Sequence, residues 1–239
     1  MSEWLWVPQP RPDARLRLYC FAHAGAGAST FLSWGSAAPP DIEIAAVRLP
    51  GREARLDEAP LTRLPAMAEL VTEAIVSSVD RDFGLFGHSA GGKLAIHVTA
   101  SLEGVRLLPR HTFVSGAPAN VAVEPIFNLA HDEFVEAIAR RFGPLPRQIT
   151  DDPEVWKIFE RPLRADLEAL ATDDLLPRPL DTPLTVIRGL RDWVIKAEEM
   201  EGWRGWNASL NYEVVDADHF SYRIDPRPYL SVIARLLLQ

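Results

Sequence analysis

Phe83-Gly84-Leu85-Phe86-Gly87-His88-Ser89-Ala90-Gly91-Gly92-Lys93-Leu94 is the stretch that decides the fold of this chain. Its first half is an apolar run typical of buried strands, and its last residues begin an apolar helical pattern. The residues between them, Gly87 to Gly91, have the form G-x-S-x-G. A serine at the centre of that motif, between a strand and a helix, sits on a sharp turn that exposes its hydroxyl. An ordinary glycine-rich turn is the alternative, but it does not require this context, so we predict that Ser89 is a nucleophile.

Strand and helix patterns alternate on both sides of this stretch. Short runs rich in β-branched and aromatic residues predict six strands: Leu16–Ala22, Ile42–Leu49, Asp82–Gly87, Thr112–Ser115, Leu184–Arg188 and Leu210–Val215. Most of them are almost continuously apolar, which is typical of strands covered on both faces. Helical patterns occupy Leu61–Val79, Gly92–Glu103 and Pro226–Leu238. The alternation predicts an α/β fold with a mostly parallel sheet flanked by helices, and Trp4–Val7 is a candidate for an additional edge strand.

One long stretch, residues 121–180, interrupts the alternation. It has no convincing strand pattern, but Asp132–Phe142 and Arg161–Leu170 each place apolar residues at helical spacing. Because the stretch lies between two predicted strands, we expect an inserted helical lid over the carboxyl edge of the sheet. A longer set of packing helices is the alternative. We find no internal repeat and no flexible linker, so residues 1–239 are expected to form a single domain that carries this lid.

A serine nucleophile needs a base, and His219 is the best-placed histidine. Where G-x-S-x-G forms a nucleophile turn, the acid and then the histidine follow the serine along the chain. His219 follows the last predicted strand, where a loop can return over the edge of the sheet. The other five histidines flank strands, lie in helices or belong to the inserted stretch, and they are poorer candidates: His23, His88, His97, His111 and His131.

Three aspartates compete for the role of the acid. Asp192 follows the strand Leu184–Arg188, and open α/β sheets bind their ligands at the carboxyl ends of strands. Asp216 and Asp218 are close to His219 in sequence, but neighbouring residues of one loop rarely aim their side chains at each other. We therefore favour Asp192, whose alternative role is that of a turn-forming or helix-capping aspartate.

The oxyanion of an acyl-transfer intermediate needs two backbone N–H donors. One belongs to the residue after the serine, Ala90, and the other to a loop that follows an earlier strand. Residues 21–27, Phe-Ala-His-Ala-Gly-Ala-Gly, form a small-residue loop after the first long strand, and we assign Ala24 as the second donor. Such a loop could also cradle a phosphate, but the Lys-Ser/Thr pair that a P-loop requires does not follow it.

The composition excludes several other classes of protein. The chain has 239 residues, with 25 Lys and Arg against 33 Asp and Glu, so its formal net charge is −8. This acidic balance argues against nucleic-acid binding, which needs a basic face. A single cysteine, Cys20, excludes an intrachain disulfide, and no His and carboxylate cluster has the spacing of a metal site. We see neither a signal sequence nor a membrane-spanning stretch, and we expect a cytoplasmic protein without metal or cofactor.

Seven blocks spread over nearly the whole chain resemble the free-standing type II thioesterases of polyketide and nonribosomal peptide assembly lines. They are residues 18–25 (LYCFAHAG), 49–53 (LPGRE), 85–89 (LFGHS), 113–116 (FVSG), 163–166 (LRAD), 189–192 (GLRD) and 218–220 (DHF). The PGRE block and the HAG loop separate this family from generic esterases better than G-x-S-x-G does. The chain departs from the family at Ala22, where proline is common, at Gly25-Ala26, where two glycines are common, and at Ala90, where methionine is common.

The resemblance implies an α/β-hydrolase fold, a catalytic triad of Ser89, Asp192 and His219, and a lid in the inserted helical stretch. It also implies hydrolysis of acyl groups from the phosphopantetheine arm of acyl or peptidyl carrier proteins, as an editing step that clears stalled or aberrant chains. The alternatives are a generic serine carboxylesterase, a chain-releasing thioesterase, and a catalytically silent binding module. Because carrier proteins are commonly acidic too, docking would depend on local basic patches, for which the candidates are Arg140, Arg141, Arg147, Arg161 and Arg164.

Overall fold

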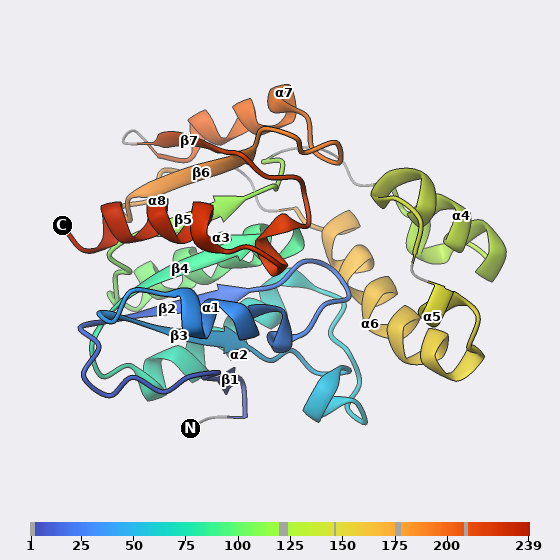
Figure 1. Ribbon diagram of the computed structural model, residues 1–239, viewed down its shortest axis with the longest axis horizontal. Helices are drawn as coiled ribbons and strands as arrows, with labels where there is room; N and C mark the ends of the chain where they lie inside the picture. The colour runs from blue at the N-terminus through green and yellow to red at the C-terminus, as the bar shows by residue number, and fades with distance from the viewer. Residues whose placement is uncertain (1–2, 120–123, 146, 175–177, 208–209) are drawn as a thin grey trace.

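Seven strands form one sheet in the order β1-β3-β2-β4-β5-β6-β7 (Figure 1). The computed structural model describes residues 3–119, 124–145, 147–174, 178–207 and 210–239. Neighbouring strands from β3 to β7 run parallel, and only β1, among the described strands, is antiparallel to its neighbour. The strands are β1 (Leu5–Trp6), β2 (Leu16–Phe21), β3 (Ile42–Val47), β4 (Asp82–His88), β5 (Thr112–Ser115), β6 (Leu184–Gly189) and β7 (Asn211–Val215).

The six strands expected from the sequence are all present, and their ends differ from the expected ones by at most two residues. The mostly parallel sheet is therefore confirmed. The candidate edge strand at Trp4–Val7 is also present as β1, in which Leu5 pairs with Val47 and Trp6 pairs with Ala46.

The chain changes direction across the sheet between β2 and β4, which are adjacent. From β2 the chain passes to β3 on one side, whereas from β4 it continues through β5, β6 and β7 on the other side. Such a switch point opens a crevice at the carboxyl ends of the two strands, where open α/β sheets bind their ligands. The loop after β2 and the Ser89 turn after β4 therefore meet at this crevice.

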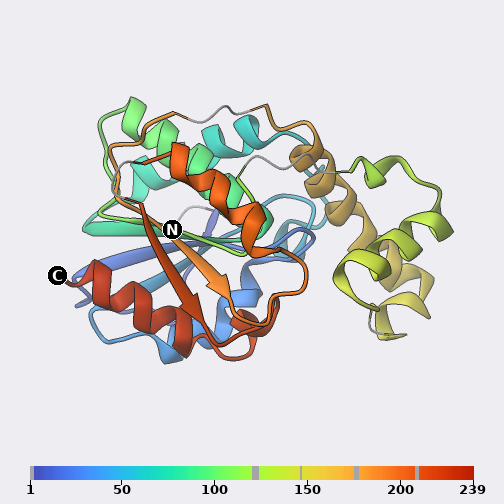
Figure 2. The same ribbon diagram turned by 90° about the horizontal axis from the view of Figure 1, so that it is seen from above.

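Helices cover both faces of the sheet (Figure 2). On one face, α1 (Leu32–Ala37) and α8 (Arg227–Leu237) pack against strand side chains such as Phe86. On the other face lie α2 (Leu64–Ser78), α3 (Ala90–Gly104) and the short α7 (Ala197–Met200). Each face of the sheet thus has its own apolar core.

The helices α2 and α3 follow the burial that their sequence patterns predicted. In α2, Met67, Val71 and Ile75 recur at three- or four-residue spacing and are buried, whereas Val76 faces solvent. Helix α3 is apolar on nearly all sides and is almost entirely buried, because it packs against the sheet, α2 and the helical segment that follows β5. In the described part of the chain, no helix combines the length and the apolar character that crossing a membrane requires.

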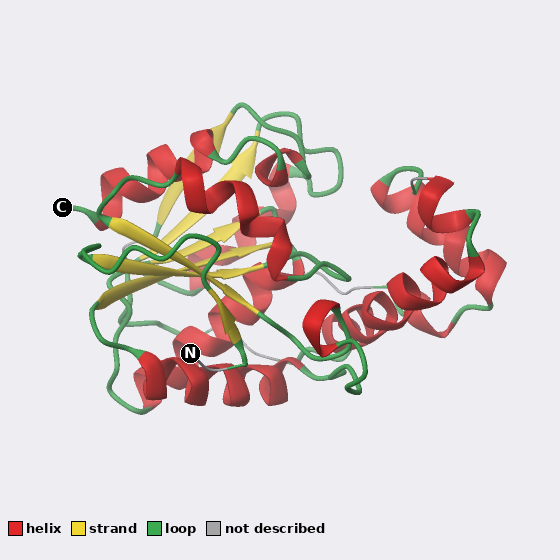
Figure 3. Cartoon of the chain, turned by 60° about the horizontal axis from the view of Figure 1, so that its bottom comes forward, coloured by secondary structure: helices red, strands yellow, loops and turns green. Residues whose placement is uncertain are grey.

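Between β5 and β6 the chain leaves the sheet and forms a helical segment beyond its edge (Figures 1 and 3). The segment contains η3 (Ile126–Asn128), α4 (His131–Phe142), α5 (Arg147–Thr150) and α6 (Pro153–Ala171). These elements share a small apolar core of their own. Of the stretch expected to form a lid, residues 121–180, the positions 121–123, 146 and 175–177 lie outside the described residues.

Helix α6 is longer than its sequence pattern indicated, because it begins at Pro153 and not at Arg161. The expected start was wrong because Pro162, which usually marks a helix end, lies inside this helix. Pro162 is buried, and the free energy gained by its tertiary packing offsets the loss of the backbone hydrogen bond that the proline removes. The true start carries a capping signal: the Asp152 carboxylate accepts two backbone N–H groups of the first turn, at 2.9 and 3.3 Å, and Pro153 follows.

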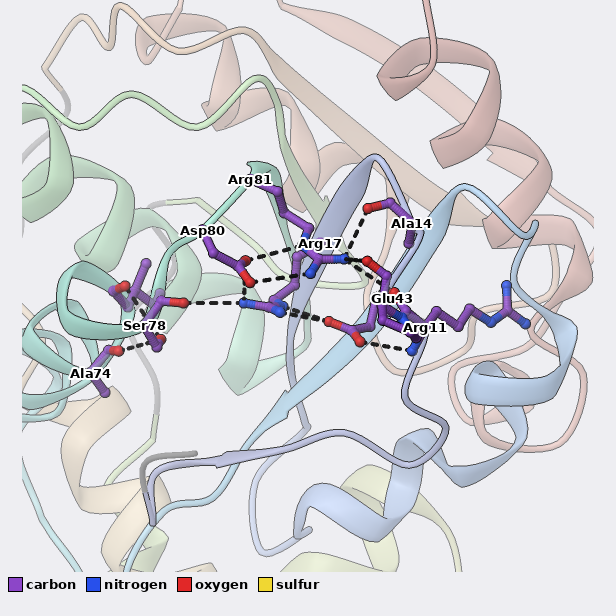
Figure 4. A network of polar contacts seen from close by, with 10 residues as sticks. Arg11, Ala14, Arg17, Glu43, Ala74, Ser78, Asp80 and Arg81 are labelled. Atoms are coloured by element: carbon purple, nitrogen blue, oxygen red, sulfur yellow. Dashed lines mark hydrogen bonds and ion pairs between the residues drawn. The ribbon is translucent and has the colours of Figure 1, made fainter.

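A polar network lies near the amino ends of β2 and β3, at the end of the sheet opposite to the Ser89 turn (Figure 4). Arg17 forms ion pairs with Glu43 and Asp80, at N–O distances of 2.7 and 3.0 Å. Glu43 also accepts a hydrogen bond from the Arg11 N–H at 2.9 Å, and Arg81 donates to the backbone carbonyls of residues 11, 12 and 14. This network ties the N-terminal segment to the sheet on the side away from the crevice.

Candidate active site

Ser89 occupies the sharp turn between β4 and α3, at the carboxyl edge of the sheet. Its backbone angles, φ 54° and ψ −120°, lie outside the regions that residues with a side chain favour. The conformation is held by the strand and the helix on either side and by a hydrogen bond from the Ser89 N–H to the Ser115 carbonyl at 2.8 Å. Backbone strain of this kind concentrates at functional sites.

The two glycines of the motif are required by close backbone contacts. A Cβ atom on Gly87 would lie 2.1 Å from the Gly91 carbonyl oxygen, and a Cβ atom on Gly91 would lie 2.2 Å from the Phe21 carbonyl oxygen. Real Cβ atoms do not approach backbone oxygens this closely. The turn therefore packs directly against the end of β2, and this contact brings Ser89 beside the loop that follows β2.

His219 and Asp192 form a buried pair near Ser89. The His219 Nδ1–H donates to Asp192 Oδ2 at 2.9 Å, and the two side chains are only 1% and 2% exposed. Asp192 Oδ1 accepts the backbone N–H groups of Val194 at 2.9 Å and Ile195 at 3.0 Å. These bonds fix the carboxylate, and a carboxylate that accepts from Nδ1 leaves the lone pair of the imidazole on Nε2.

The Nε2 atom of His219 is buried and has no hydrogen-bond partner among the described residues. Ser89 and His219 line the same cavity. The described contacts include no hydrogen bond between the two side chains, and catalytic bonds of this kind often tighten only when substrate is bound. The arrangement leaves the unpartnered Nε2 of His219 and the half-buried Ser89 side chain at the same cavity.

The structure separates Asp192 from its two competitors. Asp216 forms an ion pair with Arg191 at the surface. Asp218 accepts the backbone N–H of Phe220 at 2.8 Å and so stabilises the turn that carries His219. Asp192 is the aspartate whose carboxylate contacts the His219 ring.

Gly116, at the end of β5, makes room for this pair, and the sequence analysis did not single it out. Its φ angle of +52° is one that residues with a side chain rarely adopt. A Cβ atom there would lie 2.8 Å from His88 Cε1 and 3.3 Å from both Asp192 Oδ2 and His219 Cε1. Its presence in the FVSG block is the signal that could have identified it.

We expect Gly116→Ala to lower kcat by about 100-fold, because the added methyl group displaces the Asp192–His219 pair and small displacements of catalytic groups have effects of this size. The positive φ angle should also reduce the free energy of unfolding by about 1–2 kcal/mol. The matched control is Gly104→Ala at the end of α3, where an added Cβ meets no atom within 4 Å. Equal kcat values for the two variants, measured on folded protein, would contradict the prediction.

Two further histidines near His219 are held uncharged. The ring of His88 stacks on Tyr222 at 4.1 Å and lies 4.8 Å from the His219 ring, and burial lowers its pKa well below the usual value. His23 bonds the Tyr222 hydroxyl at 2.6 Å, and burial, followed by the charge of Arg223, lowers its pKa to about 3. Both rings are therefore neutral near neutral pH.

The remaining histidines and the cysteine have structural surroundings. His97 bonds Asp173 at 2.8 Å, and His111 bonds Thr185 at 2.7 Å. His131 lies at the exposed start of α4. Cys20 is fully buried in β2, where burial raises the pKa of its thiol and makes it a poor nucleophile.

The proposed oxyanion donors lie on the two elements that meet at the crevice. Ala90 is the first residue of α3, where backbone N–H groups have no partner within the helix. In the loop after β2, Gly25 N–H donates to Asp166 at 2.8 Å and Ala26 N–H donates to the His23 carbonyl at 3.1 Å. No hydrogen bond among the described residues engages the Ala24 N–H, and Ala24 lines the cavity beside Ser89.

A buried ion pair between Arg52 and Asp166 holds this loop. The contact is bidentate, at 2.7 and 2.8 Å, and both side chains are less than a tenth exposed. Asp166 Oδ2 also accepts the Gly25 N–H, and Arg52 also donates to the Ala26 carbonyl at 3.0 Å. The pair therefore connects the PGRE block, the Ala24 loop and helix α6, a role that the sequence analysis did not assign to it.

Glu53, the next residue of the PGRE block, supports the same loop from its other end. Its carboxylate accepts the backbone N–H groups of Ala28 and Ser29, each at 2.9 Å. A Cβ atom on Gly27 would lie 2.2 Å from the Glu53 carboxyl carbon. The absence of a side chain at Gly27 thus allows Glu53 to cap the short helix η1 (Ala28–Phe31).

We expect Asp166→Asn to lower the free energy of unfolding by about 3–5 kcal/mol, because it leaves the buried Arg52 guanidinium without its counter-charge. Urea denaturation monitored by circular dichroism measures the change. The matched control is Asp82→Asn, which removes an exposed ion pair to Arg110 and should cost about 0–1 kcal/mol. Similar losses in both variants would show that the Arg52–Asp166 pair has no special importance for stability.

A cavity of about 580 Å³ is lined by Ser89, His219 and Ala24 and is mostly apolar. It reaches the surface, since exposed residues such as Ser29, Trp193 and Arg223 are among those that line it. Its apolar wall comes largely from the helical segment: Ile138, Phe142, Pro144, Leu145, Ile149, Phe159 and Leu163. Among the described residues, no group of three or more His, Cys, Asp or Glu side chains is placed to hold a metal ion.

The strand order and the Ser89 turn at the switch point define an α/β-hydrolase fold. Residues 16–230 match the family model described as a thioesterase domain. The chain belongs to the thioesterase family, whose members on this fold act on thioesters as serine hydrolases.

Three similar proteins show where in the family the chain lies. The AMB antimetabolite synthetase AmbE of Pseudomonas aeruginosa is 35% identical over 196 residues, which are 80% of this chain but only 9% of AmbE. RedJ, a thioesterase from the prodiginine biosynthetic pathway of Streptomyces coelicolor, is 31% identical with a TM-score of 0.86, covering 96% of this chain and 93% of RedJ. YbtT, the type II thioesterase of the yersiniabactin NRPS/PKS pathway, is 26% identical with a TM-score of 0.85, covering 97% of each chain. The resemblance to type II thioesterases is therefore confirmed.

Proposed function

We propose that this thioesterase hydrolyses acyl groups from the phosphopantetheine arm of acyl or peptidyl carrier proteins, as an editing step in polyketide or nonribosomal peptide biosynthesis. The observation that carries the proposal is the buried Asp192–His219 pair beside Ser89 at an apolar cavity. The likeness to YbtT, a type II thioesterase of an NRPS/PKS pathway, and to RedJ, a thioesterase of the prodiginine pathway, supports the choice of substrate. The proposed location is the cytoplasm, as expected from the sequence.

In the first half of the proposed reaction, His219 Nε2 takes the proton of the Ser89 hydroxyl while Oγ attacks the thioester carbonyl carbon. Asp192 keeps the ring in the required tautomer and stabilises the imidazolium that forms. The backbone N–H groups of Ala24 and Ala90 donate to the developing oxyanion. Collapse of the intermediate breaks the carbon–sulfur bond, and the thiolate takes the proton from His219. A thiol of pKa about 8.5 is a good leaving group, so this step requires little acid catalysis.

In the second half, water replaces the thiol next to the acyl-serine. His219 accepts a proton from this water as the oxygen attacks the ester carbonyl, and the same two N–H groups hold the second oxyanion. The acyl–Oγ bond then breaks, the proton returns from His219 to Ser89, and a carboxylic acid leaves. The cycle restores the enzyme and needs no further reactant.

We propose that residues 121–180 act as a lid within the single domain 1–239. The helical segment, through α4, the loop after it, α5 and α6, supplies most of the apolar cavity wall, so an acyl chain attached to Ser89 would lie beneath it. Helix α6 also packs directly on the loop that carries Ala24, since a Cβ atom on Gly25 would lie 3.1 Å from Leu163 Cβ. Lid position and oxyanion geometry would then be coupled through this contact.

The structure divides the basic candidates for carrier-protein docking. Arg164 forms an ion pair with Glu160 at 2.6 Å and donates to the carbonyls of Phe127 and Leu129 at 2.8 Å, so it stabilises the helical segment. Arg161 is exposed but donates to the Leu56 carbonyl at 3.3 Å, and Arg141 is half-buried beside the Phe142 ring. Arg140 and Arg147 are exposed and are the better candidates for a partner.

The proposed function is tested by giving the wild-type protein an acyl-phosphopantetheinyl carrier protein and, separately, an oxyester with the same acyl group. We expect the carrier-bound thioester to be hydrolysed with the higher kcat/KM, measured by the release of the free acid. Oxyester hydrolysis without hydrolysis of the carrier-bound thioester would favour a generic carboxylesterase. Binding of the carrier protein without turnover of either substrate would favour a silent binding module.

A further inference from the structure

The cavity that contains Ser89 has two chemically different sides. The side formed by the helical segment is apolar, as described above. The side formed by η1 and η5 (Ser221–Arg223) carries hydroxyl groups and a cation, because Ser29, Thr30 and Arg223 line it. An apolar acyl chain forms no hydrogen bonds or ion pairs with such groups, so the polar side suits a different part of the substrate.

Arg223 is a cation without a counter-charge in this cavity. It takes part in no ion pair with any residue that the structure describes, and no Asp or Glu is among the residues that line the cavity. In a chain with a net charge of −8, this leaves an exposed guanidinium free to bind an anion.

Arg223 is also close to the proposed catalytic groups. Its guanidinium carbon lies 5.7 Å from the centre of the Phe220 ring, and that ring lies edge-on to His219 at 4.9 Å. The charge of Arg223 contributes to the low pKa of His23, which lines the same cavity. The positive charge of Arg223 therefore lies close enough to the cavity to affect groups inside it.

The backbone that carries Arg223 is firmly held, although its side chain is exposed. Ser33 Oγ donates to the Arg223 carbonyl at 3.1 Å, and the buried Trp34 Nε1–H donates to the Tyr222 carbonyl at 2.8 Å. Both donors belong to α1, so η5 is fixed against the body of the domain. A cation on such a rigid support loses little backbone entropy when it binds a ligand.

We propose that the polar side of the cavity receives the phosphopantetheine arm and that Arg223 binds its phosphate, an inference that rests on the proposed function. The planar guanidinium can offer two parallel N–H groups to phosphate oxygens. The Ser29 hydroxyl already donates to the Glu53 carboxylate, so its oxygen can accept from an amide of the arm, and the Thr30 hydroxyl can bond the hydroxyl or an amide of the arm. The arm thus enters between η1 and η5, its thioester reaches Ser89, and the acyl group extends beneath α4 and α6.

The test uses two small substrates with the same acyl group, the thioester of 4′-phosphopantetheine and the thioester of pantetheine, which lacks the phosphate. We expect the wild-type kcat/KM to be about tenfold higher for the phosphorylated substrate, through a lower KM. Arg223→Ala should reduce this preference to about one, and Arg223→Lys should retain part of it. The matched control is Arg227→Ala, which removes a nearby exposed arginine that is paired with Asp225 at 2.7 Å and does not line the cavity. This control should keep the wild-type preference.

Two results would overturn the assignment of Arg223. One is a wild-type preference near one, and the other is a preference that survives in Arg223→Ala, which would point to entry of the arm past Trp193. If the wild-type protein hydrolyses neither these thioesters nor the acyl carrier protein, the proposed function fails and the inference fails with it. That outcome is distinguishable, because it appears before any comparison with the Arg223 variants.

Discussion

Ser89→Ala is expected to lower kcat for thioester hydrolysis by about 10⁴-fold to 10⁶-fold, since removal of a catalytic serine has effects of this size. Without Oγ no acyl-enzyme can form, and the remaining turnover would come from water held near the two oxyanion donors. In energy this is about 5–8 kcal/mol of lost transition-state stabilisation. The measurement is single-turnover release of acid from an acylated carrier protein, with the uncatalysed rate subtracted.

The fold should survive this change, because alanine keeps the Cβ atom and no described hydrogen bond depends on Oγ. Circular dichroism and urea denaturation check this point. Ser36→Ala is the matched control, since that exposed serine lies on α1, does not line the cavity and bonds only the Ser33 carbonyl. If Ser89→Ala retained more than about a tenth of the wild-type kcat, Ser89 could not be the nucleophile.

Asp192→Asn is expected to lower kcat by about 10⁴-fold while leaving KM nearly unchanged. The amide can still accept the Val194 and Ile195 N–H groups, so the loop should keep its shape. Its NH₂ group, however, would face His219 Nδ1, and the ring would then have to carry its proton on Nε2. In that tautomer the histidine cannot accept the proton of Ser89.

Asp218→Asn provides the comparison, because Asp218 is the aspartate next to His219 in sequence. Its Oδ1 accepts only the Phe220 N–H among the described contacts, a bond that the amide oxygen can also make. We expect kcat within a few-fold of wild type for this variant. A large loss in Asp218→Asn together with a small loss in Asp192→Asn would refute the assignment of the acid.

Much of the fold was predictable because its signals are local. The strands are continuous apolar runs, the G-x-S-x-G turn has its strand and its helix within the same dozen residues, and the small-residue loop follows its strand directly. Asp192 became a candidate through a topological rule, that parallel strands end at one edge of the sheet, and it was preferred over Asp218 because neighbouring residues of one loop rarely aim their side chains at each other. The contact between Asp192 and His219 agrees with that reasoning, and their catalytic roles are the subject of the experiments above.

Features that depend on contacts between distant segments were not predictable. The sequence marks Arg52 and Asp166 as parts of two blocks, but nothing in it shows that they meet inside the protein. The length of α6 was missed for a similar reason, because only tertiary packing explains a buried proline within a helix.

The sequence by itself thus determined the α/β sheet, the sharp turn at Ser89, and which residues stand at the carboxyl ends of the strands. The strands and helices follow from the spacing of apolar residues along the chain. The turn follows from the close backbone contacts around Ser89, which only glycine allows at Gly87 and Gly91. Tertiary structure alone decided that Gly116 makes room for the Asp192–His219 pair, that Arg52 and Asp166 hold the Ala24 loop, and that Arg223 stands unpaired at the cavity. Each of these depends on distances between segments far apart in the chain, and such distances are fixed only when the apolar cores have packed.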